Sequence, residues 1–449
     1  MIALSDGDSE ASIRKTGMQN RQFSWLVVML ACVGLASADD FLRERLQDKQ
    51  AEQTDAWVYN DIRQAMDESK KQNKPIFVTF RCVPCKACAA FDADVANGNE
   101  RVRDLVKDKF VAVRQVEMKG VDLSLFQFDY DLNWAGIFIN ADGVVYARYG
   151  TQSSEGPDAY NSIDGLINTM HRVLELHARY PDNRSELVGK RGPEKLVSNA
   201  VELPGIRNRD KYAQQTTRQN CIHCHNIHDA EHQHAFDVGT YSPEMLLKYP
   251  LPDSIGLKID RQSGIRINEV ISGSAADLAG LKPGEEIVWM NGQRMASIAD
   301  MQWVLHHLPN TITQVDITTS VSSKHTVTLK ADWKQSDFSW RASMWNAPPR
   351  FQAWAPVVTA EERAKLGLPE TDTALEVRWI NRESAGGMRS IDDGLREKDL
   401  IIAIAGKPLR MNTRQFNVHI KSNYKVGDAL PLTVLRNGKT EELKIHLVE

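Results

Sequence analysis

The sequence predicts a multidomain chain: an α/β domain, then a short segment rich in cysteine and histidine, then two α+β domains that are mainly β. Three observations predict this order. Strand and helix patterns alternate up to about residue 178, five of the twelve histidines lie between His223 and His234, and two similar segments follow at 250–332 and 370–449. With 449 residues, 42% of them hydrophobic, the chain can form several packed cores. Its net charge of −4 argues against nucleic-acid binding.

The predicted boundaries follow changes in composition and periodicity along the chain. They are a signal peptide region (1–38), the α/β domain (52–180), a polar linker (181–220), the Cys/His segment (221–248), the first repeat (250–332), a Trp-rich connector (333–369) and the second repeat (370–449).

The N-terminal region has the pattern of a secretory signal. An apolar run of eleven residues, Trp25 to Leu35, follows Arg21 and precedes the small residues Ala36-Ser37-Ala38. The run is too short to span a bilayer comfortably. We therefore expect an exported protein of the periplasm or cell envelope, starting near Asp39 and without a transmembrane helix in the mature chain.

The α/β domain is predicted from its order of apolar runs. A helical pattern runs from Trp57 through Met66, and Pro75–Phe80 is a buried-strand run that is followed by a second helix. Phe110–Val113 is another strand, and the segment 137–146 is a hairpin with an Asp-Gly turn. A helix with apolar spacing covers 163–174. The order β-α-β-β-α after a leading helix predicts an α/β arrangement.

Cys82-Val83-Pro84-Cys85-Lys86 lies between the predicted strand and the next helix. A cysteine there faces unpaired backbone N–H groups and the positive end of the helix dipole, which favour the nucleophilic thiolate. The segment resembles thioredoxin, in which the same Pro-Cys-Lys follows the first cysteine, and the resemblance covers roughly residues 55–178. It implies that Cys82 attacks a disulfide and that Cys85 resolves the mixed disulfide, with a redox partner protein.

Two departures from thioredoxin leave other uses of these cysteines open. Arg81 stands where thioredoxin has tryptophan, and the segment 133–136 lacks the cis-proline that faces the motif and keeps metals away from it. Cys88, one helical turn after Cys85, is a possible third thiol of the site. Thiol redox chemistry, metal or copper binding and a structural role all remain open for the three cysteines.

Cys221-Ile222-His223-Cys224-His225 matches the attachment signature of c-type haem. In that reading Cys221 and Cys224 bind the haem covalently and His225 binds the iron, with His234 or Met245 as candidates for the sixth ligand. Two cysteines and two of the neighbouring histidines could instead hold zinc or copper. A plain disulfide or loop is the third alternative.

The first repeat resembles the PDZ domains of bacterial periplasmic proteases, through Ile255–Ile259, Val270–Ala276 and Ala279-Gly280-Leu281. The resemblance implies that Ile255, Gly256, Leu257 and Lys258 capture the C-terminus of a protein or peptide, beside a groove helix at 300–305. The second repeat keeps the core from Gly394 to Gly406 but has no clear binding loop. A Ser-His-Asp constellation is not recognisable upstream, so the repeats do not imply proteolysis.

The whole order resembles the planctomycete-type thioredoxin-7/PDZ domain (seleno)proteins, and Phe338-Ser339-Trp340-Arg341 is also typical of them. Selenocysteine in the redox motif of some members favours a redox role for Cys82 and Cys85. Three hypotheses follow: a thiol–disulfide oxidoreductase with haem and PDZ modules, a non-enzymatic PDZ scaffold, or a copper- or zinc-handling protein.

Overall fold

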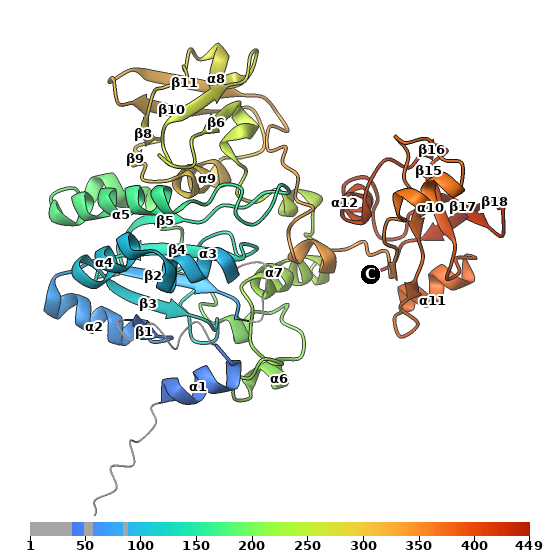
Figure 1. The fold of residues 1–449 in the computed structure, drawn as a ribbon, viewed down its shortest axis with the longest axis horizontal. Coiled ribbons are helices and arrows are strands. Elements are labelled where there is room, and N and C mark those ends of the chain that lie inside the picture. Colours follow the sequence, from blue (N-terminus) through green and yellow to red (C-terminus); the bar gives the residue numbers. More distant parts are fainter. Residues whose placement is uncertain (1–37, 49–56, 84–88) are drawn as a thin grey trace, which may run out of the picture. The chain divides into compact units, whose positions relative to one another are not determined.

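The computed structural model describes residues 38–48, 57–83 and 89–449 (Figure 1). The predicted signal peptide, apart from Ala38, and the cysteines Cys85 and Cys88 lie outside the described residues. The predictions for these residues therefore rest on the sequence alone. Within the described part, none of the helices is both long and apolar enough to cross a membrane.

A five-stranded mixed sheet with the order β1-β3-β2-β4-β5 forms the first domain. The first three strands are parallel to one another, whereas β4 runs antiparallel to β2 and β5 antiparallel to β4. The strands are β1 (Trp57–Tyr59), β2 (Ile76–Arg81), β3 (Val111–Gln115), β4 (Trp134–Ile139) and β5 (Val145–Tyr149). The helices are α1 (Ala38–Leu46), α2 (Ile62–Gln72), α3 (Ala89–Ala93), η3 (Asp94–Gly98), α4 (Glu100–Lys109) and α5 (Ile163–Ala178).

The α/β class is confirmed, and the predicted hairpin turn is present: Asn140 N donates to Val144 O at 3.0 Å, and Gly143 has a φ of +75°. The helical pattern predicted from Trp57 is wrong at its start. Residues 57–59 form β1, paired in parallel with β3, and the helix begins only at Ile62. Trp-Val-Tyr has high strand propensity, and three residues are too few to show a period.

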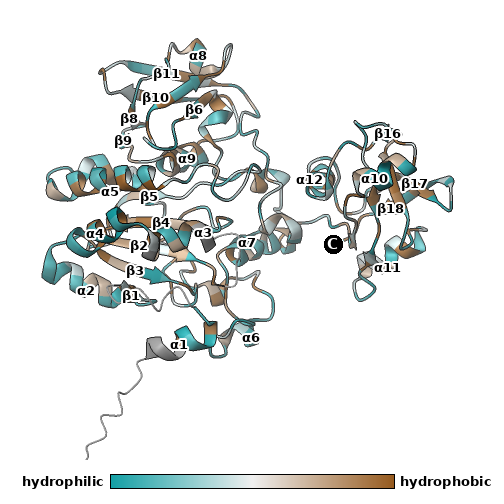
Figure 2. Cartoon of the chain, viewed as in Figure 1, coloured by the Kyte–Doolittle hydropathy of each residue, from teal (hydrophilic) through white to brown (hydrophobic). Residues whose placement is uncertain are grey.

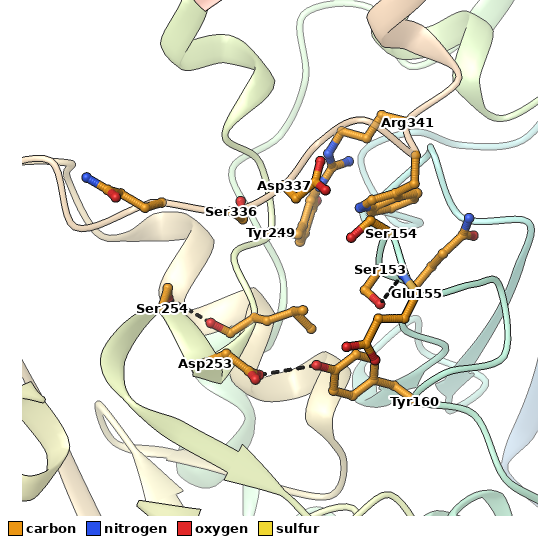
Figure 3. A pocket seen from close by; sticks show the side chains of 14 residues that line it. Ser153, Ser154, Glu155, Tyr160, Tyr249, Asp253, Ser254, Ser336, Asp337 and Arg341 are labelled. Atoms are coloured by element: carbon orange, nitrogen blue, oxygen red, sulfur yellow. Dashed lines mark hydrogen bonds between the residues drawn. The ribbon is translucent and has the colours of Figure 1, made fainter. Parts of the chain in front are cut away.

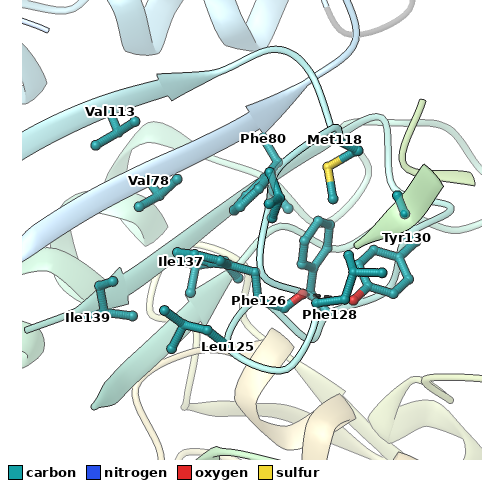
Figure 4. Close-up of a cluster of buried hydrophobic side chains, with 14 of the residues drawn as sticks. Val78, Phe80, Val113, Met118, Leu125, Phe126, Phe128, Tyr130, Ile137 and Ile139 are labelled. Atoms are coloured by element: carbon teal, nitrogen blue, oxygen red, sulfur yellow. Dashed lines mark hydrogen bonds between the residues drawn. The ribbon is translucent and has the colours of Figure 1, made fainter. Parts of the chain in front are cut away.

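Alternate side chains of the central strands enter two cores on opposite faces of the sheet. On one face Val78, Phe80 and Ile137 meet aromatic residues of the loop before β4, among them Phe126 and Phe128 (Figure 4). On the other face Phe77 stacks on Phe138, with ring centroids 4.7 Å apart, under helices α4 and α5. Figure 2 reflects this burial. Much of strands β2 and β4 is brown, the colour of hydrophobic residues, whereas the helices that cover the sheet carry both hydrophobic and hydrophilic residues.

The stretch 181–220 is not the loose linker that its polar composition predicted. It contains η4 (Arg184–Lys190), η5 (Ala200–Glu202) and α6 (Arg209–Ala213), and its few apolar residues, such as Leu187, Ala200 and Leu203, join the two cores of the first domain. Helix α7 (His225–Asp237) follows and adds Ile227 and Ala230 to the first core. The Cys/His segment is therefore packed onto the α/β domain.

The two repeats have the same order of elements, two strands, a helix, two strands, a helix and two strands, which supports the internal repeat read from the sequence. The first contains β6 (Leu257–Ile259), β7 (Ile267–Val270), α8 (Ala275–Leu278), β8 (Ile287–Met290), β9 (Gln293–Arg294), α9 (Ile298–His307), β10 (Thr313–Thr319) and β11 (Lys324–Leu329). The second contains β13 (Leu375–Glu376), β14 (Trp379–Ile380), α11 (Ala385–Asp392), β15 (Leu400–Ile404), β16 (Lys407–Pro408), α12 (Thr413–Asn423), β17 (Ala429–Arg436) and β18 (Lys439–His446). Each repeat has its own hydrophobic core.

Short elements surround the repeats. The segment 243–255 holds η6 (Pro243–Leu246) and η7 (Pro252–Ile255), and the Trp-rich connector holds η8 (Ser343–Asn346), β12 (Ala353–Trp354) and α10 (Ala360–Lys365). The connector is not fully exposed, since Trp333, Phe338 and Arg341 are all buried. It therefore contributes to packing between elements rather than acting only as a spacer.

Helix α9 of the first repeat packs directly on β5 and η4 of the α/β domain. Asp300 forms a fully buried ion pair with Lys190, at 2.7 Å, and accepts a hydrogen bond from the backbone N–H of Arg148 at 3.1 Å. The Arg148 guanidinium lies 3.6 Å from the centroid of the Trp303 ring. Buried charges are tolerated only when paired, so these contacts fix one orientation of α9 on the sheet edge.

Candidate thiol redox site

Cys82 follows directly after β2 and lies against a residue far away in the sequence. Its Sγ is 2.8 Å from Nδ1 of His223, within the Cys/His segment. The contact joins residues 141 positions apart and brings the two cysteine motifs of the chain into one site. Imidazole beside a thiol is an arrangement that activates cysteine nucleophiles, because the ring can take the thiol proton.

Three contacts hold the Cys/His segment beside the end of β3. Ile222 N donates to Glu117 Oε1 at 3.1 Å, Met118 N donates to Ile222 O at 3.3 Å, and Cys221 Sγ lies 3.6 Å from Val116 O. His223 N then donates to Asn226 Oδ1 at 3.0 Å, at the start of α7. These bonds fix the backbone of the segment on both sides of His223, so its ring is positioned by main-chain geometry.

The pKa values of Cys221 and Cys224 depend on the charge of Cys82, so the three sulfurs belong to one site. Burial raises the pKa values of the Cys221 and Cys224 thiols well above the ordinary range, and the charge of Cys82 contributes to both shifts. Burial, with help from His225, lowers the pKa of His223 to about 4. The His223 ring is thus neutral at pH 7, and its Nδ1 lies within hydrogen-bond distance of the Cys82 thiol.

Arg81, which replaces the tryptophan of thioredoxin, belongs to a buried charge cluster beneath Cys82. It pairs with Asp92 at 2.7 Å, and Arg114 pairs with both Asp92, at 2.9 Å, and Asp48, at 3.1 Å. Trp134 Nε1 also donates to Asp92, at 3.2 Å. Burial opposes the charge of Arg114, but the carboxylates outweigh it, so its pKa is raised. The cluster ties the end of β2 to α1, α3 and β4.

A second buried cluster anchors α7. Asp131, in the loop before β4, accepts hydrogen bonds from His228 Nδ1 at 2.9 Å, from Arg341 Nη1 at 3.2 Å and from Ser343 N and Oγ at 2.8 and 2.7 Å. Arg341 also pairs with Asp129 at 2.6 Å. Although burial favours a protonated carboxyl, these donors hold the pKa of Asp131 well below its usual range. Helix α7, and with it His223, is fixed to both the sheet and the connector.

The residues of the predicted haem site fit a covalent haem poorly in this packing. Cys221 is only 5% exposed and packs with Leu42, Leu46, Tyr59 and Val116, so its sulfur has little open space beside it. His225 starts α7, with Nδ1 at 3.2 Å from Asp229 Oδ2. Haem attachment at Cys221, Cys224 and His225 stays a prediction of the sequence.

Of the two proposed sixth ligands, His234 is exposed on the same helix as His225. Nine residues of helix separate the two side chains by about 13 Å, so both cannot bind one iron. Met245 lies in η6, beyond the end of α7. The helix that carries both histidines therefore disfavours His234 as the partner of His225, and the sixth ligand stays a prediction of the sequence.

Among the described residues, one group has the geometry of a metal site: Asp129, Asp131 and His228. Arg341 already supplies the cation there, so this group is an ion-pair cluster. His232, on the same helix, is 2% exposed, and neither of its ring nitrogens has a hydrogen-bond partner in the described structure. Zinc or copper binding by the Cys/His segment stays a prediction.

The predicted peptide-binding residues lie at the start of β6. Gly256 has a φ of +93°, and a side chain there would collide with Ser274. Leu257 is buried and Lys258 exposed, with its Nζ 3.0 Å from Glu269. In the described sheets β6 pairs with β7 on one side, so a peptide strand can add to its other edge. The helix predicted at 300–305 is confirmed as part of α9, and its place beside a peptide groove stays a prediction.

A cavity of about 250 Å³ lies next to this loop, away from the thiol site. Figure 3 shows Tyr160 donating to Asp253 and the carboxylates of Glu155 and Asp337 nearby. Ser254 Oγ donates to Leu251 O, at 2.7 Å, and a histidine is not among the residues that line the cavity. The cavity is therefore lined mainly by polar and acidic side chains, and Cys82 and His223 are not among them.

Sequence reasoning found Cys82, Cys221 and Cys224 and counted His223 among the histidines that could bind a metal, but it did not predict the direct contact between His223 and Cys82. It also missed Asp48, Asp92 and Arg114, whose charges are isolated in the sequence. A weak signal was available: Arg114 and Gln115 end an otherwise apolar strand run, and a charge is rarely buried in such a run unless it is paired.

Comparisons with known proteins agree with two parts of this architecture. A model of thioredoxin-like domains matches residues 57–141, and a model of the PDZ domain matches residues 245–309. A search of curated proteins found no match.

Among solved structures, similar chains include the HtrA-type protease AlgW with a decapeptide, at 23% identity and a TM-score of 0.18, and the same protease with a tripeptide, at 24% identity and a TM-score of 0.18. Each match covers 22% of this chain and 28% or 31% of the protease chain, so this chain spans less than a third of those proteins. From the two family models, we conclude that the chain contains a thioredoxin-like domain and, after it, a PDZ domain.

Proposed function

We propose that this protein is an exported thiol–disulfide exchange protein that binds clients through its PDZ domain. The observation that carries the redox part is the 2.8 Å contact between Cys82 Sγ and His223 Nδ1 at the end of β2. In the proposed reaction the Cys82 thiol gives its proton to His223 and attacks a client disulfide, and Cys85 is the resolving thiol implied by the thioredoxin resemblance. Burial keeps the imidazole neutral at pH 7, so its ring nitrogen is open to this proton, and the lowered pKa makes it a weaker base than a free imidazole.

The direct test is the reduction of a small disulfide, such as oxidised glutathione, by the mature chain with dithiothreitol as the reductant. Catalysis well above the rate of an equal concentration of free cysteine supports the proposal. A rate no higher than that of free cysteine contradicts it and leaves the scaffold hypothesis as the better account. Absorption spectra of the same sample report any haem or copper, which the sequence also predicts as possible cofactors.

The PDZ domain is proposed to hold the C-terminus of the client. Three features support this: Gly256 in the left-handed region at the start of the loop, the edge of β6 that does not pair with β7, and helix α9, which shares a core with β6. The second repeat has the same element order, and we propose that it is a PDZ-like module whose main role is packing. Export rests on the N-terminal signal pattern.

Capture of a C-terminus predicts a sharp dependence on the terminal carboxylate. A peptide ending in a free hydrophobic residue is expected to bind the mature chain at least about tenfold more tightly than the same peptide with an amidated end, because the loop N–H groups bind a charge. Fluorescence anisotropy with labelled peptides measures both affinities. Equal affinities would show that the C-terminus is not what the domain recognises.

A further inference from the structure

Cys221 and Cys224 do not take part in the exchange reaction described above, yet they lie in the segment that contacts Cys82. His223, which touches Cys82, is the residue between Ile222 and Cys224. Val83, immediately after Cys82, packs against the small cluster that contains Cys221. Neither Cys221 nor Cys224 is in a disulfide in the structure. Three described sulfurs from two distant segments therefore converge on the end of β2.

The two thiols of the pair are placed differently. Cys221 is almost fully buried, with its Sγ next to Val116 O, and its strongest charged neighbour is Glu117. Cys224 is less covered, directly follows His223, and has Cys82 as its strongest charged neighbour. Cys224 thus directly follows the residue that contacts Cys82, and Cys221 is the more deeply covered of the two thiols.

We propose that Cys224 and Cys221 form a second, built-in dithiol that exchanges disulfides with Cys82, so that the segment read as a haem signature is the intramolecular redox partner of the thioredoxin-like domain. The proposal rests on the exchange function proposed above for Cys82.

The exchange steps balance in atoms and electrons without a further reactant. Cys82 attacks a client disulfide, one client thiol leaves with the proton, and a Cys82–client disulfide forms. In this route Cys224 takes the place of Cys85 as the resolving thiol. It attacks the Cys82 sulfur, the second client thiol leaves with the Cys224 proton, and a Cys82–Cys224 disulfide forms. Cys221 then attacks Cys224 and its proton returns to Cys82, leaving a Cys221–Cys224 disulfide. Two electrons pass from the dithiol to the client disulfide.

The Cys221→Ala variant tests this proposal because it lacks the thiol that resolves the Cys82–Cys224 disulfide. The mature variant is treated with oxidised glutathione, quenched in acid, alkylated and digested with trypsin. Cleavage after Arg81, Lys86, Arg218 and Lys248 places Cys82 in the fragment 82–86 and Cys224 in the fragment 219–248. We expect these two fragments to be disulfide-linked through Cys82 in most of the protein, and the link to fall at least about tenfold in Cys224→Ala.

Three results would overturn the proposal. One is a fragment 82–86 that carries glutathione but no link to 219–248, which leaves the exchange function of Cys82 intact. Another is an equal amount of linked fragment in Cys82→Ser/Cys221→Ala, which assigns the link to Cys85. The third is wild-type fragment 219–248 carrying covalent haem. No modification of Cys82 at all would instead contradict the underlying exchange function.

Discussion

Replacing Cys82 by serine is expected to lower the rate of small-disulfide reduction by at least about 10³-fold, to the level of the uncatalysed reaction. Serine keeps the size of the side chain but is not a thiolate nucleophile at neutral pH. The assay is the dithiothreitol-coupled reduction described above, run at equal concentrations of the mature wild-type and variant chains.

Peptide binding by the PDZ domain is the internal control for this variant. The binding loop at Gly256 belongs to a different core from Cys82, so the affinity for a free C-terminus should not change. A variant that keeps both peptide binding and most of its exchange activity would show that another thiol carries the reaction.

Replacing Asp131 by asparagine is expected to lower the free energy of unfolding of the α/β domain by about 3–5 kcal/mol, because it leaves the buried Arg341 and His228 without their shared carboxylate. The exchange rate should fall too, since α7 and the segment beside Cys82 depend on this anchor. Thermal unfolding followed by circular dichroism measures the first effect. Asp142→Asn, in the exposed hairpin turn, is the matched control and should change stability by less than about 0.5 kcal/mol.

The same cluster predicts a pH dependence. The pKa of Asp131 is lower in the folded chain than in the unfolded chain, so its contribution to stability is fully present above the ordinary carboxyl pKa, near 4. That contribution is lost as the pH falls below about 4 toward the folded-state value. Asp131→Asn should therefore show a shallower loss of stability in acid than the wild type. Parallel acid profiles in the two proteins would contradict this role of the carboxylate.

Much of the fold could be predicted because it is encoded locally. The apolar runs at Ile76–Arg81 and Trp134–Ile139 and the Asp-Gly turn specify strands and a hairpin by their own composition. The second copy of the C-terminal pattern predicted the same order of elements. Residues 57–59 were misread because a three-residue strand has no measurable period, and its pairing with β3 is a tertiary contact.

The sequence predicted which cysteines could react, but not which residues the fold brings next to them. Cys82 and Cys224 are recognisable from short motifs, but the contact between Cys82 and His223 spans 141 residues of chain. The contact depends on the packing of residues 181–220 against the α/β domain. The polar composition of this stretch did not predict that packing, although Ala200 and Leu203 within it are buried. The haem signature gave a local explanation for His223 and so hid its long-range partner.

The most direct test of the account is the rate at which iodoacetamide alkylates Cys82 at pH 7 in the wild type, in His223→Ala and in His234→Ala. A hydrogen bond to a charged group contributes about 1.5–3 kcal/mol, so loss of the His223 ring should slow alkylation roughly ten- to a hundredfold. His234 is exposed on the same helix, and its replacement should leave the rate unchanged. Equal rates in all three proteins would mean that His223 does not activate Cys82, and the proposed site would be wrong.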